Sequence, residues 1–323
     1  MRVLPAHRLA ALATATCLSL VFCAPVVAGC YGVRPTDEVI EVNVRPACCS
    51  TDAATLAAKM IVREYVVSDE EGNRQWVDSD LSRLTTAPGE DMVTVFHVHG
   101  NKVDPGMARD RALRVYRQLI HRATDDRPMR FVIFSWPATE IDGLLYDFRV
   151  KAARTQPVGW QLAWILNQMP PEVPISLIGY SYGARIVGGA LHVRAGGDLS
   201  GRSLPDAAPD KHRPLRVLFI AAATHSCWFG PHGYHRLAMS QIEHLVMLNN
   251  HLDPAMRFYA LVPKNCNPQA MGLRGPTSLA RGDRKKIECY DCANCVGRSH
   301  DLFKYTATGR TMSRAWQHLM YAD

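Results

Sequence analysis

The sequence predicts an α/β fold with one open, mostly parallel sheet and helices on both faces. Apolar, β-branched runs of strand length recur along the chain, such as VTVFHV at Val93–Val98 and LRVLFIAA at residues 215–222. Runs that are apolar at nearly every position are typical of strands buried on both faces. Amphipathic helical patterns separate several of these runs, which indicates parallel strands joined by crossover helices. Because 47% of the 323 residues are hydrophobic and 21% charged, the chain can form one sizeable core without a second domain.

The first half of the chain supplies these elements in turn. We predict strands at residues 39–44, 61–67, 93–98 and 130–136, and helices at residues 105–123 and 159–169. In the first helix, apolar residues recur at helical spacing and four arginines lie largely between them, as on a solvated face. Residues 138–157 have a less regular pattern and are predicted as a loop. Its apolar side chains, Leu144, Leu145, Tyr146 and Phe148, either line a substrate pocket or pack on the core.

A candidate nucleophile follows the next strand. Ile175, Leu177 and Ile178 form an apolar run that ends in Gly179-Tyr180-Ser181-Tyr182-Gly183, and helix formers occupy residues 184–193. A G-x-S-x-G pattern between a strand and a helix is typical of an elbow that holds a serine in a strained conformation. The alternative is a serine in an ordinary tight turn. The surrounding strand and helix favour Ser181 as a nucleophile.

A nucleophilic serine that attacks an acyl group needs two N–H donors for the oxyanion that forms. Tyr182 follows the serine, and its backbone amide is one candidate. The strand Val93–Val98 runs into His99-Gly100-Asn101, and we expect the backbone of Asn101 to supply the second donor because Gly100 lets the turn fold back. The alternative is an ordinary turn in which His99 is a structural hydrogen-bonding residue.

With these motifs the chain resembles the α/β-hydrolase family, in particular exported bacterial hydrolases of unassigned substrate, from about residue 39 to the C-terminus. The resemblance implies a single α/β-hydrolase domain, with nucleophile, acid and histidine in that order on loops after successive strands. Strands are predicted at residues 215–222 and 244–249, and Asp253 in the loop after the second is implied as the acid. Asp253 is also a suitable N-cap for a helix at residues 255–261.

The resemblance also implies a histidine after the last strand. The segment at residues 287–300 ends in a glycine-containing loop with His300, and an amphipathic helix is predicted at residues 301–321. His300 is therefore the candidate base, and Asp253 would fix its tautomer. Among the 13 histidines, His251, His225 and His232 are rivals at less suitable positions. The aromatic loop at residues 224–235, with Trp228, Phe229 and Tyr234, either lines the pocket or packs on the core.

The N-terminal segment, residues 1–29, has the pattern of an export signal. Arg2 and Arg8 precede an uncharged, apolar stretch at residues 9–27. Val27-Ala28-Gly29-Cys30 resembles a bacterial lipobox, in which the cysteine is lipidated. Cleavage after Ala28 and an uncleaved anchor are the alternatives. Each places the domain at residues 30–323 outside the cytoplasm, in the periplasm, in the cell envelope or secreted, and lipidation of Cys30 would attach it to a membrane.

Cysteine content agrees with export, since disulfides are favoured in an oxidising compartment. Eight cysteines remain after the leader. All eight can pair if Cys30 is a thiol, and seven are left for pairing if Cys30 carries lipid. The run Cys289-x-x-Cys292-x-x-Cys295, with Cys266 upstream, has the alternative interpretation of a zinc site, although it lacks a second separated pair. Disulfides are the prediction, and pairing there would hold the loop before His300.

The net charge and the absence of several motifs in the sequence exclude some classes of function. The formal charge of +7 falls to +5 when Arg2 and Arg8 leave with the signal, and no basic-aromatic pattern indicates nucleic-acid binding. There is no phosphate loop or dinucleotide fingerprint, and no metal or cofactor is implied. The sequence therefore predicts an exported serine hydrolase of esters or related acyl bonds, acting on a small-molecule or lipid substrate. The alternatives are an acyltransferase using the same triad and a non-catalytic envelope binding protein on a hydrolase scaffold.

Overall fold

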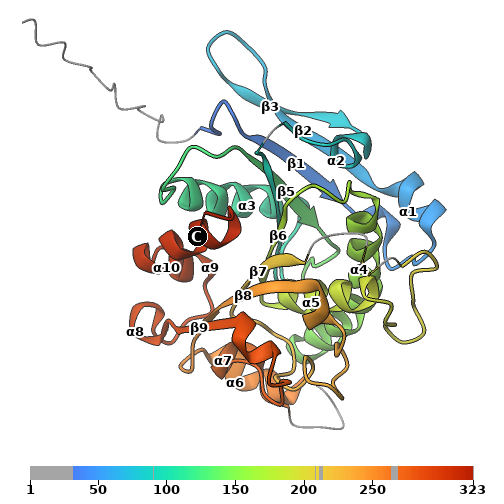
Figure 1. Ribbon diagram of the computed structural model, residues 1–323, viewed down its shortest axis with the longest axis vertical. Helices are drawn as coiled ribbons and strands as arrows, with labels where there is room; N and C mark the ends of the chain where they lie inside the picture. Colours follow the sequence, from blue (N-terminus) through green and yellow to red (C-terminus); the bar gives the residue numbers. More distant parts are fainter. Residues whose placement is uncertain (1–31, 90, 208, 211–213, 263–267, 323) are drawn as a thin grey trace, which may run out of the picture. The chain divides into compact units, whose positions relative to one another are not determined.

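The computed structural model describes residues 32–89, 91–207, 209–210, 214–262 and 268–322. Within these residues the strands form one nine-stranded sheet in the order β3-β2-β1-β5-β4-β6-β7-β8-β9 (Figure 1). Strand β2 is antiparallel to both of its neighbours, and all other pairings are parallel. The predicted α/β class with a mostly parallel sheet is confirmed. The export signal and Cys30 lie outside the described residues.

Most strands lie where apolar runs predict them. The strands are β1 (Glu38–Asn43), β2 (Ile61–Val67), β3 (Arg74–Ser79), β4 (Val93–Val98), β5 (Met129–Ser135), β6 (Ile175–Tyr180), β7 (Leu215–Ile220), β8 (Ile242–Asn249) and β9 (Ile287–Asp291). The helices are α1 (Ala53–Lys59), α2 (Ser82–Thr85), α3 (Pro105–Ile120), α4 (Leu144–Gln168), α5 (Tyr182–Arg194), α6 (Pro254–Phe258), α7 (Met271–Arg274), α8 (Ala293–Val296), α9 (Leu302–Thr306) and α10 (Gly309–Leu319). Short 3-10 turns complete the described structure.

Two apolar cores lie on opposite faces of the sheet. Helices α3, α9 and α10 cover one face, and α4 and α5 cover the other (Figure 1). Successive side chains of a strand point to opposite faces, so on β4 Val95 joins the α3 core while Phe96 joins the α4 core. Strands of this kind are apolar at nearly every position, which is why their sequences were recognisable.

The predicted loop at residues 138–157 is largely wrong. Helix α4 begins at Leu144 and continues through Pro157 to Gln168. Proline inside a helix removes one backbone hydrogen bond and disfavours the helical conformation before it, so the sequence pattern indicated a later start. Burial overrides that cost, since Thr155, Pro157 and Val158 are all buried where α4 packs on α5.

Two further elements differ from the prediction. Strand β3 was missed because its sequence, RQWVDS, is polar and it lies at the sheet edge with one neighbour. The single helix predicted at residues 301–321 is two helices, α9 and α10, separated by Ala307 and Thr308. Gly309, a weak helix former, begins the second of them. No helix in the described part of the chain is long and apolar enough to cross a membrane.

The β6–α5 connection brings three elements into close contact. A Cβ added at Gly179 would lie 2.6 Å from the Cα of Ala184, and one added at Gly183 would lie 2.0 Å from the carbonyl oxygen of Val98. Both distances are far inside van der Waals contact, and both partners are backbone atoms. Only glycine at these positions lets the N-terminus of α5 pack against the ends of β4 and β6.

We expect Gly183→Ala to lower the free energy of unfolding by about 3 kcal/mol, because the backbone carbonyl of Val98 must move to admit the methyl group. Thermal and urea unfolding measure this loss. Gly282→Ala is the control, since Gly282 has an ordinary φ of −66° and nothing within 4 Å of an added Cβ. Equal stability of the two variants would contradict the close packing at the elbow.

Candidate active site

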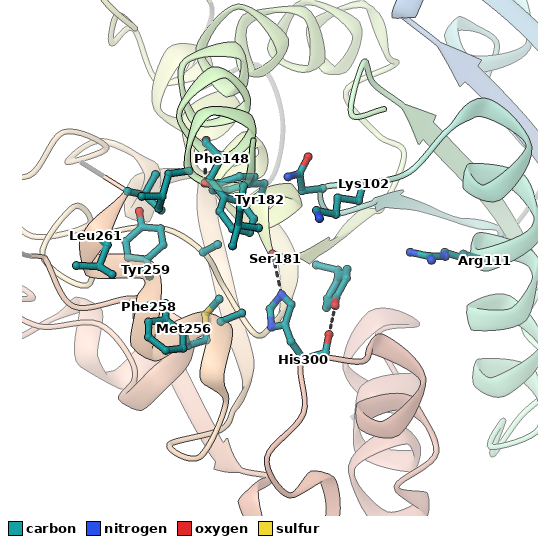
Figure 2. Close-up of a pocket in the computed structure, with 17 residues that line it drawn as sticks. Lys102, Arg111, Phe148, Ser181, Tyr182, Met256, Phe258, Tyr259, Leu261 and His300 are labelled. Carbon is teal, nitrogen blue, oxygen red and sulfur yellow. Dashed lines mark hydrogen bonds between the residues drawn. The ribbon is translucent and has the colours of Figure 1, made fainter. Parts of the chain in front are cut away.

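The structure brings the three residues predicted as a triad together in one hydrogen-bonded chain. Figure 2 shows its Ser181–His300 part. Ser181 lies between β6 and α5, Asp253 precedes α6, and His300 lies between α8 and α9. The Ser181 Oγ and His300 Nε2 atoms are 3.0 Å apart, and His300 Nδ1 lies 2.7 Å from Asp253 Oδ2. A carboxylate accepts only, so His300 Nδ1–H donates to Asp253 and Nε2 is left to accept the serine proton.

Ser181 has the strained backbone of an elbow. Its φ of 53° and ψ of −117° lie in a region that non-glycine residues rarely occupy. Hydrogen bonds on both sides hold it there: Ser181 N–H donates to the Ile220 carbonyl at 3.0 Å, and Ala223 N–H donates to the Ser181 carbonyl at 3.1 Å. The neighbouring strand β7 therefore fixes the conformation that points Oγ into the cleft.

Asp253 is fully buried, and it acts both as the partner of His300 and as a helix cap. Its Oδ1 accepts the backbone N–H groups of Ala255 at 2.9 Å and Met256 at 3.3 Å, at the start of α6. Its Oδ2 also accepts the hydroxyl of Tyr305 at 3.0 Å. Burial and the Asp253 charge raise the pKa of Tyr305, so its hydroxyl keeps its proton and remains a donor.

The loop that carries His300 is held by its backbone. Asn250 Nδ2 donates to the Gly297 carbonyl at 2.8 Å, and the hydroxyl of Tyr180 donates to the His300 carbonyl. The Tyr180 ring also stacks on the imidazole at a centroid distance of 5.4 Å. Asn250, Tyr180 and Tyr305 were not identified from the sequence. The position of Tyr180 beside the serine was the one available signal, because it places that ring at the end of β6.

The rival histidines do not reach the serine. His251 is exposed and pairs with Asp291 at 2.6 Å. His225 stacks on Trp228 at 4.3 Å, and His232 is exposed. Of the four candidates, only His300 lines the cleft that contains Ser181.

The turn after β4 lies against the serine, as predicted. A Cβ on Gly100 would be 3.1 Å from the Ser181 Cβ. His99 is a structural residue in this turn: its Nε2 accepts the Trp136 amide at 3.2 Å, and its Nδ1 lies 2.9 Å from the Gly100 carbonyl. Burial lowers the pKa of His99 well below its usual value, which keeps the ring neutral. The structural role of His99 and the predicted place of the turn therefore both hold.

The two proposed oxyanion donors are unused in the free protein. Among the described residues, neither the Tyr182 nor the Asn101 backbone amide donates to a protein acceptor. Tyr182 begins α5, where the first N–H groups of a helix have no internal partner and the helix dipole favours negative charge. Both residues line the cleft. The structure thus leaves these two donors free beside Ser181.

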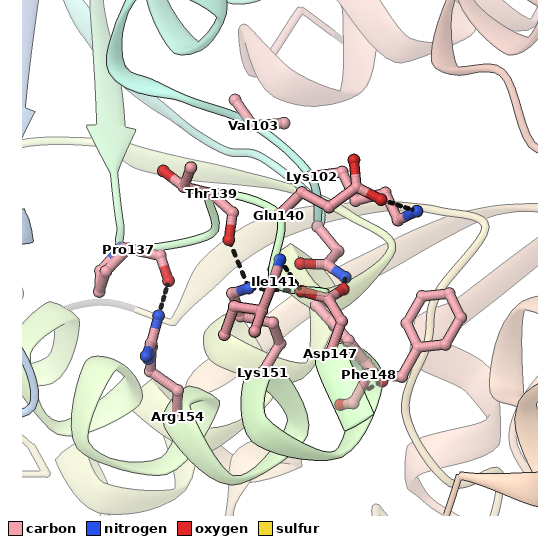
Figure 3. A network of polar contacts seen from close by, with 12 residues as sticks. Lys102, Val103, Pro137, Thr139, Glu140, Ile141, Asp147, Phe148, Lys151 and Arg154 are labelled. Carbon is pink, nitrogen blue, oxygen red and sulfur yellow. Dashed lines mark hydrogen bonds and ion pairs between the residues drawn. The ribbon is translucent and has the colours of Figure 1, made fainter. Parts of the chain in front are cut away.

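A second network, around the buried Asp147 and Lys151, holds Asn101 in place. Figure 3 shows Asp147, Lys151 and Thr139 of this network. Asn101 Nδ2 donates to Asp147 Oδ2, and the other Asp147 oxygen accepts Lys151 Nζ at 2.7 Å and the Ile141 amide at 3.0 Å. Lys151 Nζ also donates to the Thr139 carbonyl at 2.6 Å. The side chains of Asp147 and Lys151 are fully buried. This network was missed because its i, i+4 pair lies in the part of α4 predicted as a loop.

The triad opens into a cleft of about 570 Å³. Its walls are mostly apolar, and several of its large side chains are exposed at the rim, including Leu144, Phe258 and Leu261. Of the two loops predicted to line a pocket or pack on the core, the segment around Phe148 lines the cleft. The aromatic loop at residues 224–235 does not, because its Phe229 is buried in the core.

Cysteines do not build a second centre in the described part of the chain. Cys48, Cys49, Cys227, Cys289, Cys292 and Cys295 are free thiols, and no group of three or more His, Cys, Asp or Glu residues among those described is placed to hold a metal ion. Burial raises the pKa of Cys292 to about 12, so that thiol is protonated and unreactive. Cys266 lies outside the described residues, and disulfide pairing stays a prediction.

Because of the Asp147–Lys151 pair, the stability of the wild type and that of Lys151→Met should change with pH in opposite directions. Burial alone would raise the Asp147 pKa, but its hydrogen bonds to Lys151 and Asn101 outweigh this and hold it below 3.8. In the wild type the carboxylate contributes stability above pH 3.8, and this contribution is lost as the pH falls through the folded-state pKa. Lys151→Met leaves the carboxylate buried and unpaired, which costs about 3 kcal/mol at pH 7.

Protonation of Asp147 relieves that cost, so the deficit of Lys151→Met should shrink between pH 7 and pH 5. Urea unfolding at the two pH values measures it. Lys59→Met, at the exposed end of α1, is the control and should cost less than about 0.5 kcal/mol. A deficit for Lys151→Met that is the same at both pH values would contradict a charged Asp147.

Comparisons with known proteins do not identify a family for this chain. No protein-family model and no curated protein sequence matches the chain. Solved structures with some similarity include a Trichoderma reesei cutinase bound to a phosphonate inhibitor (15% identity, 71% of this chain and 75% of that chain, TM-score 0.31). An inhibited esterase B from Lactobacillus rhamnosis (8%, 88% and 88%, 0.35) and an acetylxylan esterase (14%, 71% and 96%, 0.34) are further examples. At these TM-scores the likenesses carry no argument. The mostly parallel sheet, the elbow after β6 and the chain order of Ser181, Asp253 and His300 are the features that the resemblance to the α/β-hydrolase family implies.

Proposed function

We propose that this protein is a serine hydrolase that cleaves carboxylic esters through an acyl-enzyme on Ser181. The observation that carries the proposal is the unbroken hydrogen-bonded chain from Ser181 Oγ through His300 to the buried Asp253, at 3.0 and 2.7 Å. A serine hydroxyl is a weak nucleophile until an adjacent base accepts its proton. Here His300 is the base. Asp253 orients it, and hydrogen bonds from the start of α6 hold the Asp253 carboxylate in place.

Each group has a role in the proposed reaction. Ser181 Oγ attacks the ester carbonyl carbon while His300 Nε2 takes the serine proton, and the Tyr182 and Asn101 amides bind the resulting oxyanion. The C–O bond to the alcohol then breaks, and His300 returns the proton to the departing alkoxide. Water enters, gives a proton to His300 Nε2 and attacks the acyl carbon. The bond between that carbon and Ser181 Oγ then breaks, Oγ takes the proton back from His300, and the acid leaves. Loss of one oxyanion donor would cost about 3 kcal/mol of transition-state stabilisation.

The walls of the cleft favour an apolar acyl group. Leu144, Leu145 and Phe148 come from α4, and Phe258 and Leu261 come from the segment after Asp253. Burying one such chain contributes about 0.8 kcal/mol per methylene group. An acyltransferase would use the same residues with another nucleophile in place of water, and its products would distinguish it from a hydrolase.

The first test is labelling with a fluorophosphonate, which reacts with activated serines. We expect the wild type to be labelled, and we expect Ser181→Ala and His300→Ala to lose labelling and at least about 10³-fold in ester hydrolysis. His251→Ala is a matched control, because His251 also pairs with an aspartate, Asp291, but lies away from the cleft. A folded wild-type protein that is not labelled would overturn the proposal and favour a non-catalytic binding protein.

We propose in addition that the protein is exported and lipidated at Cys30. The support is the sequence at residues 1–29, with Arg2 and Arg8 before an uncharged apolar stretch and small residues before the cysteine. Labelled palmitate fed to the producing bacterium should be incorporated into the wild type and not into Cys30→Ser. Cys49→Ser is the control. A secreted protein without lipid would favour cleavage after Ala28 instead.

A further inference from the structure

We propose that the natural substrate is an ester whose alcohol carries an anionic group, a phosphate or a carboxylate, and that Arg111 binds this anion. The inference rests on the proposed ester hydrolysis and names the substrate class for the same cleft. It makes Arg111 a specificity-determining residue, separate from the triad and the oxyanion donors.

The charge of the cleft is one-sided. Its lining has two cationic side chains, Lys102 and Arg111, and no aspartate or glutamate. Asp253, the acidic residue of the triad, does not line the cleft, because it is fully buried behind the His300 imidazole. A mostly apolar cleft whose lining includes basic but no acidic side chains is suited to a ligand that is apolar at one end and negative at the other.

The two cations differ in how far their charge is already compensated. Lys102 pairs with Glu140. Arg111 has no hydrogen-bond or ion-pair partner among the described residues, and it is half-buried. Its neighbours on α3 do have partners: Arg109 lies over the Trp76 ring and Arg114 over the Phe303 ring. Arg111 is thus a cation on the cleft wall whose five donors are unused, and planar guanidinium donors match carboxylate and phosphate oxygens.

Figure 2 shows the Arg111 guanidinium directed from α3 toward the triad, on the opposite side of Ser181 from Phe148 and Leu261. The Tyr180 ring stacks on His300. Burial and the charges of Asp253 and Asp301 raise the pKa of the Tyr180 hydroxyl, and the charge of Arg111 acts in the opposite direction, which places Arg111 near this ring. Because His300 Nε2 must protonate the departing alcohol, that alcohol lies on the His300 side of the serine. The acyl chain then extends toward α4, and an anion on the alcohol meets Arg111.

The test compares soluble esters that share a decanoyl chain and differ in the alcohol: glycerol, glycerol 3-phosphate, glycerate and the zwitterionic glycerophosphocholine. Each is used below its micelle concentration, so that one molecule at a time meets the cleft. We expect kcat/KM to be about tenfold higher for the phosphate and the glycerate than for glycerol, the size expected of a hydrogen-bonded charge. If only one of the two anions shows the preference, that anion is the group Arg111 binds. The preference should shrink as salt rises from about 50 mM to about 500 mM.

Arg111→Gln should bring the ratio of anionic to neutral kcat/KM close to one. Arg114→Gln is the matched control, since it removes the same charge from the same helix outside the cleft, and it should keep the preference. Equal rates on glycerol and both anionic esters, or a preference that survives Arg111→Gln, would overturn the inference while leaving ester hydrolysis intact. If Ser181 is labelled but none of these esters is cleaved, the substrate class is wrong. If Ser181 is not labelled either, the proposed function fails with it.

Discussion

The site depends above all on one buried carboxylate. Asp253 has no solvent exposure, so every lone pair of its charged form must be matched by a donor within the protein. The matches come from three places: the start of α6, the imidazole of His300 and the hydroxyl of Tyr305. Because these donors lie on separate segments, satisfying the charge also fixes where α6, the histidine loop and α9 lie relative to β8. The geometry of the triad is therefore a consequence of electrostatic compensation in the core.

The parallel sheet could be predicted from the sequence because its strands are buried on both faces. Val93–Val98 and Ile175–Tyr180 are completely buried, and such strands leave an apolar signature that no solvated loop shares. Strand β3 has no such signature, since one edge and much of its surface face solvent. The same physical difference explains why the elbow at Ser181, surrounded by buried elements, was placed correctly.

The partners of the triad could not be predicted for a different reason. Tyr305 lies 52 positions from Asp253 and shares no local pattern with it. The Tyr305 hydroxyl can donate to the buried carboxylate only because the fold brings its backbone close. No local sequence pattern reveals that position. Asp147 and Lys151 are an intermediate case, since their i, i+4 spacing is a readable pairing once a helix is assumed. Pro157 disfavours that helix in the sequence, but packing of α4 against α5 stabilises it in the folded protein.

Helix α4 joins two jobs in its first two turns. Leu144, Leu145 and Phe148 form part of the apolar wall, while Asp147, within the same turn, holds the side chain of Asn101. The wall of the cleft and the anchor of the Asn101 turn therefore lie in one stretch of helix. A substitution that shifts the first two turns of α4 would alter the shape of the wall and the position of Asn101 together. The two features cannot vary independently in this fold, because one helix end carries both.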